Sequence, residues 1–145
     1  MTTPFERLHP ALQHHVVNSL GWTDLRPFQQ AVIGPVLEGR HLLVLAETAG
    51  GKTEGAFFPI LSRMLTEGWQ GLSVLYVCPI KALLNNLDAR LDRYCTLLGR
   101  RSALWHGDVA AGQKKAILRD PPDCLLTTPE SLEAVSYTHL RAHET

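Results

Sequence analysis

The stretch from Leu42 to Glu54 reads Leu-Leu-Val-Leu-Ala-Glu-Thr-Ala-Gly-Gly-Lys-Thr-Glu and decides how the rest of the chain is interpreted. It opens with an apolar run, Leu42 to Ala46, that has no polar alternation and is typical of a strand covered on both faces. Two consecutive glycines follow, and a helical pattern begins at Lys52. A strand, a glycine-rich turn and a helix in this order predict an α/β fold.

Residues 46–53 fit the phosphate-loop pattern G-x-x-x-x-G-K-[ST], except that Ala46 replaces the first glycine. A loop without bulky side chains lets backbone N–H groups converge on an anion, and the start of the following helix adds partial positive charge. The pattern predicts that Lys52 contacts the β- and γ-phosphates of a nucleotide and that the Thr53 hydroxyl binds Mg²⁺. The alternative is a glycine-rich turn that holds no phosphate. The remaining nucleotide-binding positions of the loop are Thr48, Ala49, Gly50 and Gly51.

Apolar runs and helical patterns alternate after this loop. Further strands are expected over Ser73–Cys78, Ser102–His106 and Cys124–Thr128, and helices over Lys52–Leu65, Lys81–Leu98 and Val109–Arg119. This alternation predicts a parallel sheet with right-handed crossovers and helices on both faces.

Single residues predict where several helices begin and end. Before the loop, a helix with a stripe from Leu8 to Leu20 is expected to stop at Gly21, and a second helix to run from Pro27 to Gly39. Pro59 predicts that the helix after the loop kinks or ends early. Asp108 is the expected N-cap of the helix over Val109–Arg119.

Composition limits the class of protein. The 145 residues suffice for one domain, and 14 Lys+Arg balance 14 Asp+Glu, which argues against a polybasic nucleic-acid binder but leaves room for a local basic groove. No apolar run approaches the roughly 20 residues of a membrane helix, and the first residues do not resemble a secretory signal. Three widely spaced cysteines predict reduced, buried thiols in a cytoplasmic protein.

The loop resembles motif I of superfamily 2 helicases, which have alanine in place of the first glycine. Residues 48–54 are most similar to the Lhr-like (large helicase-related) branch and to related DEAD/DEAH-box proteins, many of which also have a proline at the place of Pro59. The resemblance covers Gly21 to Ala134. It implies a P-loop NTPase with a RecA-like parallel sheet, here incomplete, and ATP with Mg²⁺ as cofactors.

Arg26-Pro27-Phe28-Gln29 resembles the Q motif of these helicases. The resemblance implies that Gln29 reads adenine, a task suited to an amide that both donates and accepts hydrogen bonds. The alternative is an exposed helix residue. Where DEAD-box proteins place an aromatic residue that stacks on the base, this sequence has Leu12 near the expected position.

Two later segments resemble motifs that hold one nucleic-acid strand. Residues 79–83 resemble motif Ia, and residues 127–132 resemble motif Ib. Both follow expected strands, and ligands of open α/β sheets bind beyond the carboxyl ends of the strands. The alternative is an ordinary turn capped by its own side chains. The resemblance implies backbone contacts to single-stranded DNA or RNA by Pro79, Lys81, Ala82, Thr128, Pro129 and Glu130.

Residues 105–108, Trp-His-Gly-Asp, are similar to a segment that Lhr-like proteins have between these motifs. Residues 136–145 resemble a translated sequencing adapter, so residues 1–135 are expected to be the N-terminal part of the ATP-binding domain; the alternative is a native C-terminal helix. No Asp-Glu pair follows Ser131, although the resemblance implies such a motif II, as well as a second RecA-like domain, for hydrolysis.

The sequence therefore predicts the ATP-binding fragment of an ATP-dependent nucleic-acid helicase, an enzyme as the whole protein and inactive as this fragment. Lys52 and Thr53 are the expected catalytic residues. Two alternatives remain: a non-catalytic module that binds nucleotide or nucleic acid, and another P-loop NTPase such as a small-molecule kinase.

Overall fold

The structure is a computed structural model that describes residues 2–45 and 51–135. The chain divides into two compact units, Met1–Trp69 and Gln70–Thr145, and each is described by itself. The expected tail at residues 136–145 lies outside the described residues, so the boundary after residue 135 stays a prediction.

The N-terminal unit is helical. It contains a 3-10 helix (Phe5–Arg7), α1 (Pro10–His14), a π-helical turn (His15–Ser19), α2 (Pro27–Leu37) and α3 (Lys52–Glu67). The single helix expected over the first stripe is thus split into short pieces, although Leu8, Leu12 and Val16 are buried as their spacing predicts. The chain leaves the last of these pieces before Gly21, which has a φ of 72°.

Helix α3 continues through Pro59 to Glu67, so of the two alternatives at this proline the early end is wrong. A proline inside a helix costs roughly 3 kcal/mol. Phe57, Phe58, Leu61 and Met64 on the same helix are buried, and burial of each such side chain contributes about 1.5–3 kcal/mol. The apolar face therefore outweighs the cost of the proline.

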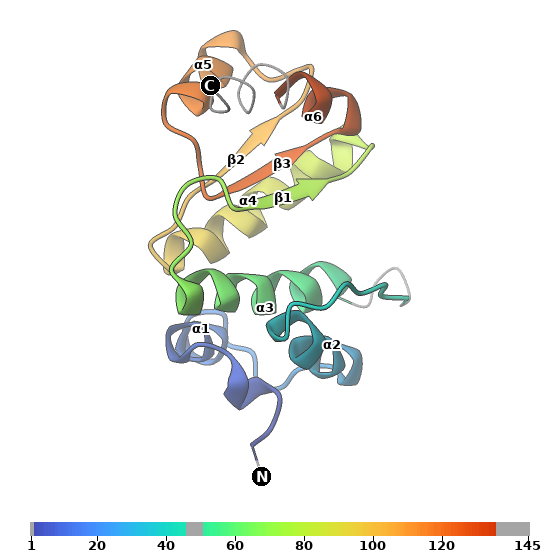
Figure 1. Cartoon of the computed structure of the whole chain (residues 1–145), viewed down its shortest axis with the longest axis vertical. Coiled ribbons are helices and arrows are strands. Elements are labelled where there is room, and N and C mark those ends of the chain that lie inside the picture. The colour runs from blue at the N-terminus through green and yellow to red at the C-terminus, as the bar shows by residue number, and fades with distance from the viewer. Residues whose placement is uncertain (1, 46–50, 136–145) are drawn as a thin grey trace. The chain divides into compact units, whose positions relative to one another are not determined.

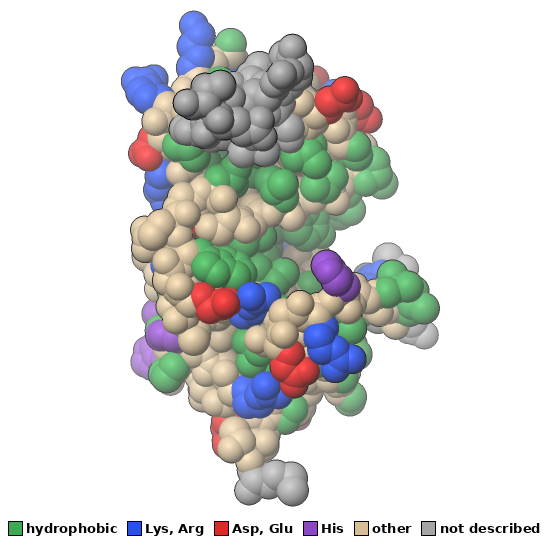
Figure 2. Space-filling model, in the orientation of Figure 1, with side chains coloured by type: hydrophobic (Ala, Val, Ile, Leu, Met, Phe, Trp, Pro, Cys, Tyr) green, Lys and Arg blue, Asp and Glu red, His purple; other side chains and the backbone are tan. Residues whose placement is uncertain are grey.

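The strand expected over Leu42 to Ala46 is wrong for the described residues 42–45, which form no strand; Ala46 lies outside the described residues. Leu43 and Leu45 are 82% and 85% exposed, and the green side chains of this segment lie at the surface in Figure 2. An apolar run indicates which residues suit a covered strand, but a strand also needs a neighbour for its backbone hydrogen bonds.

The C-terminal unit is an α/β sandwich (Figure 1). Its elements are β1 (Val74–Val77), α4 (Lys81–Leu97), β2 (Ser102–Trp105), α5 (Ala111–Arg119), β3 (Cys124–Thr127) and α6 (Pro129–Val135). The strand order is β1-β3-β2, and both pairings are parallel. The parallel sheet and its three strands are therefore confirmed.

Helices cover both faces of this sheet, as predicted. On one face, Cys95 of α4 places its Sγ 3.7 Å from the Sγ of Cys124 in β3. On the other face, Ile117 of α5 packs against Trp105 and Leu125. Cys78, Cys95 and Cys124 are buried free thiols, as expected, and the hydrogen bond with Cys95 together with burial raises the pKa of the Cys124 thiol. In the described part of the chain, no helix has the length and apolarity needed to cross a membrane.

The predicted N-cap at Asp108 is wrong. Helix α5 begins two residues later than expected, at Ala111, and Ala110 occupies the N-cap position without a side-chain hydrogen bond. The Asp108 carboxylate instead forms an ion pair with Lys81. The Asp108 carboxylate thus pairs with the Lys81 ammonium group and does not accept hydrogen bonds from backbone N–H groups at the start of α5, as an N-cap would.

Candidate functional site

Gly51 is the glycine directly before Lys52 in the expected phosphate loop, and it is the N-cap of α3. Its φ and ψ are 75° and 32°, in the left-handed region that favours glycine. A Cβ atom here would lie 2.6 Å from Nε2 of Gln29. The Gly51 carbonyl oxygen accepts the first bond of the helix, from the N–H of Gly55 at 3.0 Å. Both the backbone angle and the close neighbour therefore require glycine.

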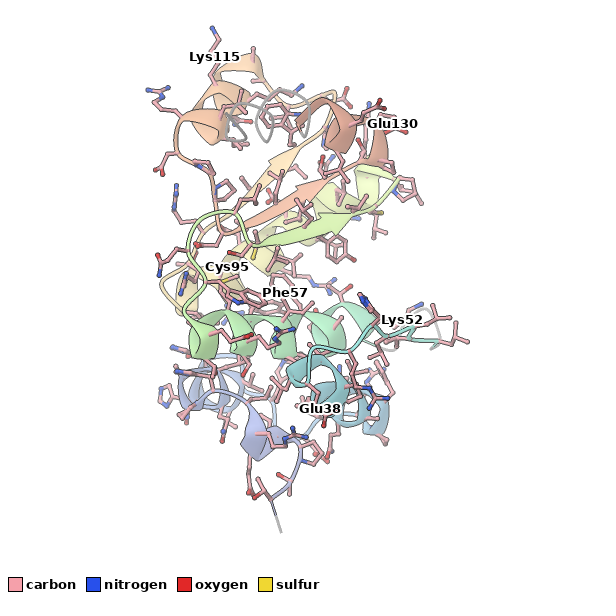
Figure 3. All side chains as sticks on the ribbon, viewed as in Figure 1. Glu38, Lys52, Phe57, Cys95, Lys115 and Glu130 are labelled. Atoms are coloured by element: carbon pink, nitrogen blue, oxygen red, sulfur yellow. The ribbon has the colours of Figure 1, made fainter. Side chains whose placement is uncertain are left out.

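The residues after Gly51 begin the helix as the loop pattern predicts. Lys52 is the first residue of α3 and its side chain is exposed (Figure 3), whereas Thr53 is half-buried and Glu54 is buried. An exposed ammonium group at a helix start suits an anionic ligand. The predicted loop residues Thr48, Ala49 and Gly50 lie outside the described residues, so their roles stay predictions.

Gln29 is buried, 3% exposed, so the alternative of an exposed helix residue is wrong. Its Oε1 accepts a hydrogen bond from the N–H of Arg26 at 2.8 Å, and its Nε2 donates to the carbonyl oxygen of Gly51 at 3.1 Å. A primary amide has two donor hydrogens and two acceptor lone pairs. Gln29 therefore joins the start of α2 to the start of α3.

A cavity of about 230 Å³ opens beside α2 in the same unit. Phe5, Trp22 and Gln30 contribute to its lining. Sequence reasoning searched for an aromatic side chain near Leu12, but Leu12 is buried, 3% exposed. Trp22 lies four residues before Arg26 of the Q-like segment, and this nearness is the sequence signal that could have identified it. Phe5 is distant in sequence from that segment and has no such signal.

The motif Ia-like and motif Ib-like segments are brought together at one edge of the sheet. Val77 at the end of β1 pairs with Thr127 at the end of β3, so Pro79 and Thr128 follow neighbouring parallel strands. Pro79, Lys81 and Ala82 are exposed at the start of α4. The carboxyl ends of parallel strands are the usual place for ligands in such sheets.

Thr128 is buried and caps α6. Its Oγ1 accepts a hydrogen bond from the N–H of Ser131 at 3.3 Å and lies 3.0 Å from the Ser131 Oγ. Pro129 and Glu130, on the first turn of α6, are exposed, and Glu130 is labelled in Figure 3. The Thr128 hydroxyl thus caps the start of α6. This agrees with the alternative interpretation of this segment as a turn capped by its own side chains.

His106 connects the end of β2 to α4. The ring is 3% exposed. Its Nδ1 accepts a hydrogen bond from the N–H of Asp108 at 3.1 Å, and its Nε2 lies 2.9 Å from Oδ1 of Asn85. An Nδ1 that accepts from a backbone N–H leaves Nε2 as the ring's donor toward Asn85.

The described residues include no group of three His, Cys, Asp or Glu side chains that could hold a metal ion. Thr53 is the one predicted Mg²⁺ ligand among the residues that the sequence singled out, and a single hydroxyl binds Mg²⁺ together with nucleotide phosphates rather than alone.

Comparison with known proteins agrees with this arrangement. A Lhr helicase and probable uracil glycosylase of Mycolicibacterium smegmatis is 35% identical in an alignment of 121 residues that covers 73% of this chain and 8% of that protein. An ATP-dependent helicase Lhr-Core of Methanothermobacter thermautotrophicus is 33% identical in an alignment of 125 residues that covers 75% of this chain and 14% of that protein. This chain therefore spans a small part of these relatives.

The fold agrees as well. The structure of the Mycobacterium smegmatis helicase Lhr bound to single-stranded DNA and AMP-PNP matches with a TM-score of 0.81 and 29% identity, over 97% of this chain and 19% of that one. The family profile of the DEAD/DEAH box helicases matches residues 26–144, a range that begins at the Q-like segment and includes the phosphate loop and both strand-end segments. With these segments in the expected order, the chain belongs to the DEAD/DEAH box helicase family.

Proposed function

We propose that this chain is the ATP-binding part of an ATP-dependent helicase that acts on nucleic acid. The observation that carries the proposal is the hydrogen bond from Gln29 to Gly51, which connects the Q-like segment to the phosphate loop. Adenine recognition and phosphate binding require these two segments to meet. The Lhr structure bound to single-stranded DNA and AMP-PNP supports the same function.

Each residue of the nucleotide site has the role that suits its chemical group. Lys52 contacts the β- and γ-phosphates, and the Thr53 hydroxyl binds the Mg²⁺ that accompanies them. The backbone of Thr48, Ala49, Gly50 and Gly51 surrounds the phosphates. Gln29 bonds adenine through its side-chain amide, a group that both donates and accepts hydrogen bonds.

Nucleic acid binds at the sheet edge where β1 and β3 end. Lys81 supplies positive charge, and Thr128 holds the start of α6 in place. The exposed residues Pro79, Ala82, Pro129 and Glu130 lie where a nucleic-acid strand would pass the ends of β1 and β3. Contacts to phosphates and sugars are shared by every sequence, so this edge suits a single strand of DNA or RNA without base preference.

Hydrolysis is not expected of these 145 residues, because they contain no Asp-Glu pair beyond Ser131 to coordinate Mg²⁺ and polarise the attacking water. The whole protein would hydrolyse ATP while it moves along a strand. The three buried free thiols support a place in the cytoplasm.

The proposal is tested by base selectivity. A fluorescent ATP analogue bound to the chain in the presence of Mg²⁺ is displaced with ATP or with GTP. We expect ATP to displace it at lower concentration, Gln29→Ala to remove this preference, and Gln113→Ala, at an exposed glutamine on α5, to retain it. Equal displacement by ATP and GTP from the unmodified chain would contradict adenine reading by Gln29.

A further inference from the structure

The lysine assigned to nucleic-acid phosphate is already paired with a carboxylate of its own chain. Nζ of Lys81 lies 3.6 Å from Oδ1 of Asp108, and both residues belong to the C-terminal unit. Both side chains are exposed, so an anion from solution reaches the lysine without any part of the fold having to open.

The turn that carries Asp108 is fixed to the helix that carries Lys81. His106 accepts the N–H of Asp108 on one ring nitrogen and donates to Asn85 from the other. Asn85 lies four residues after Lys81 on α4, which places the two side chains on one face of the helix. The carboxylate is thereby held beside the lysine by the fold, rather than reaching it from a free loop.

Gly107 brings this turn close to the lysine. A Cβ atom at this position would lie 3.3 Å from Nζ of Lys81, tighter than an ordinary contact. The turn therefore passes next to the lysine ammonium, and the short side chain of Asp108 is sufficient to reach it.

An exposed ion pair of this kind contributes only about 0–1 kcal/mol. A phosphate of a bound strand can therefore exchange with the carboxylate, but the two anions cannot both pair closely with one ammonium without repelling each other. We propose that Asp108 competes with nucleic-acid phosphate for Lys81 and so lowers the affinity of this segment for a single strand. This inference rests on the proposed function of the sheet edge.

The test measures binding of fluorescein-labelled oligothymidylate to the full 145-residue chain at low salt by fluorescence anisotropy. Lys81→Ala weakens binding because it removes a phosphate contact. Asp108→Asn strengthens binding by up to about fivefold, the change in affinity that corresponds to the free energy of one exposed ion pair. Asp108→Glu retains the affinity of the unmodified chain, and Asp108→Ser provides a second variant without the charge.

Asp120→Asn is the matched control. Asp120 pairs with Arg101 at 3.1 Å, both side chains are exposed, and the substitution changes the net charge by the same amount. Arg101 precedes β2 and Asp108 follows it, so the four residues of the strand, about 13 Å of extended chain, separate the two sites. The control is expected to leave the affinity unchanged.

The double variant Lys81→Ala/Asp108→Asn separates competition at the lysine from general repulsion. We expect no gain from Asp108→Asn once Lys81 is absent. An equal gain with and without Lys81, or an equal gain from Asp120→Asn, would overturn the inference while the nucleic-acid site stands. Unchanged binding by Lys81→Ala, or no binding by the unmodified chain, would contradict the proposed role of this edge itself.

Discussion

The side-chain nitrogen of Gln29 lies 3.1 Å from the carbonyl oxygen of Gly51, a residue 22 positions later in the chain. The bond joins the first turn of α2 to the residue that opens α3. Gln29 is buried, so this hydrogen bond is shielded from solvent.

Gly51→Ala is predicted to destabilise the N-terminal unit more than Gly68→Ala does. Both glycines have a positive φ at an end of α3, 75° and 66°, and a left-handed backbone costs a residue with a Cβ about 1–2 kcal/mol. A Cβ at Gly51 also displaces Gln29, whereas nothing lies within 4 Å of one at Gly68. Loss of the bond from Gln29 adds about 1 kcal/mol.

The measurement is the free energy of unfolding from urea titrations of the two variants. Equal destabilisation would show that Gln29 moves without cost and does not depend on Gly51.

Strand β1 is an edge of the described sheet. We therefore expect copies of the chain to associate with one another through this edge. Leu75 and Val77 are exposed on this strand, and an apolar edge strand readily pairs with another chain. We expect the chain to associate with rising concentration in sedimentation velocity, and Leu75→Lys to reduce this association. Leu118→Lys, on exposed α5, is the control that adds the same charge away from the edge. A chain that stays monomeric at every concentration would contradict this role of β1.

Asp88→Asn is predicted to stabilise the chain near neutral pH. Burial and, to a lesser extent, the carboxylate of Asp92 raise the pKa of Asp88, so the fold favours its neutral form. Ionisation therefore costs stability above the folded-state pKa, and the cost disappears below the unfolded value of about 3.9. Removal of the like-charge pair, four residues apart on α4, contributes about 0.2–0.5 kcal/mol.

Urea titrations of the Asn variant and the unmodified chain across this pH range check the prediction. If the difference in unfolding free energy between the two proteins stays constant with pH, ionisation of Asp88 is not the cause of that difference.

Much of the C-terminal unit could be predicted because local patterns coincide with its contacts. The runs that become β1, β2 and β3 are apolar and bounded by turn residues, and the apolar stripe of α4 is buried at Leu84, Leu87 and Leu91. The resemblance to the Q motif identified Gln29 as a site residue, whereas its burial could not be predicted from its sequence context.

The errors arise where a partner distant in sequence decides the outcome. The residues Leu42 to Leu45 are as apolar as β3, but no strand forms there, because apolarity does not supply a hydrogen-bond partner. Asp108 precedes a helix as an N-cap does, but Lys81, 27 positions earlier, takes its carboxylate. Strand pairing and ion pairing of this kind depend on which distant residues the fold brings into contact, and local sequence patterns do not contain that information.

The most direct test of nucleotide binding is the affinity of the chain for ATP with Mg²⁺, measured by calorimetry on the unmodified chain, Lys52→Ala and Lys115→Ala. Lys115 is an exposed lysine on α5, labelled in Figure 3, and its variant controls for the loss of one positive charge. Charge-assisted hydrogen bonds contribute about 1.5–3 kcal/mol, so Lys52→Ala is expected to raise Kd by about tenfold or more, whereas Lys115→Ala leaves Kd unchanged. Equal affinities of all three proteins, or ATP binding that does not depend on Mg²⁺, would contradict the phosphate loop as the nucleotide site.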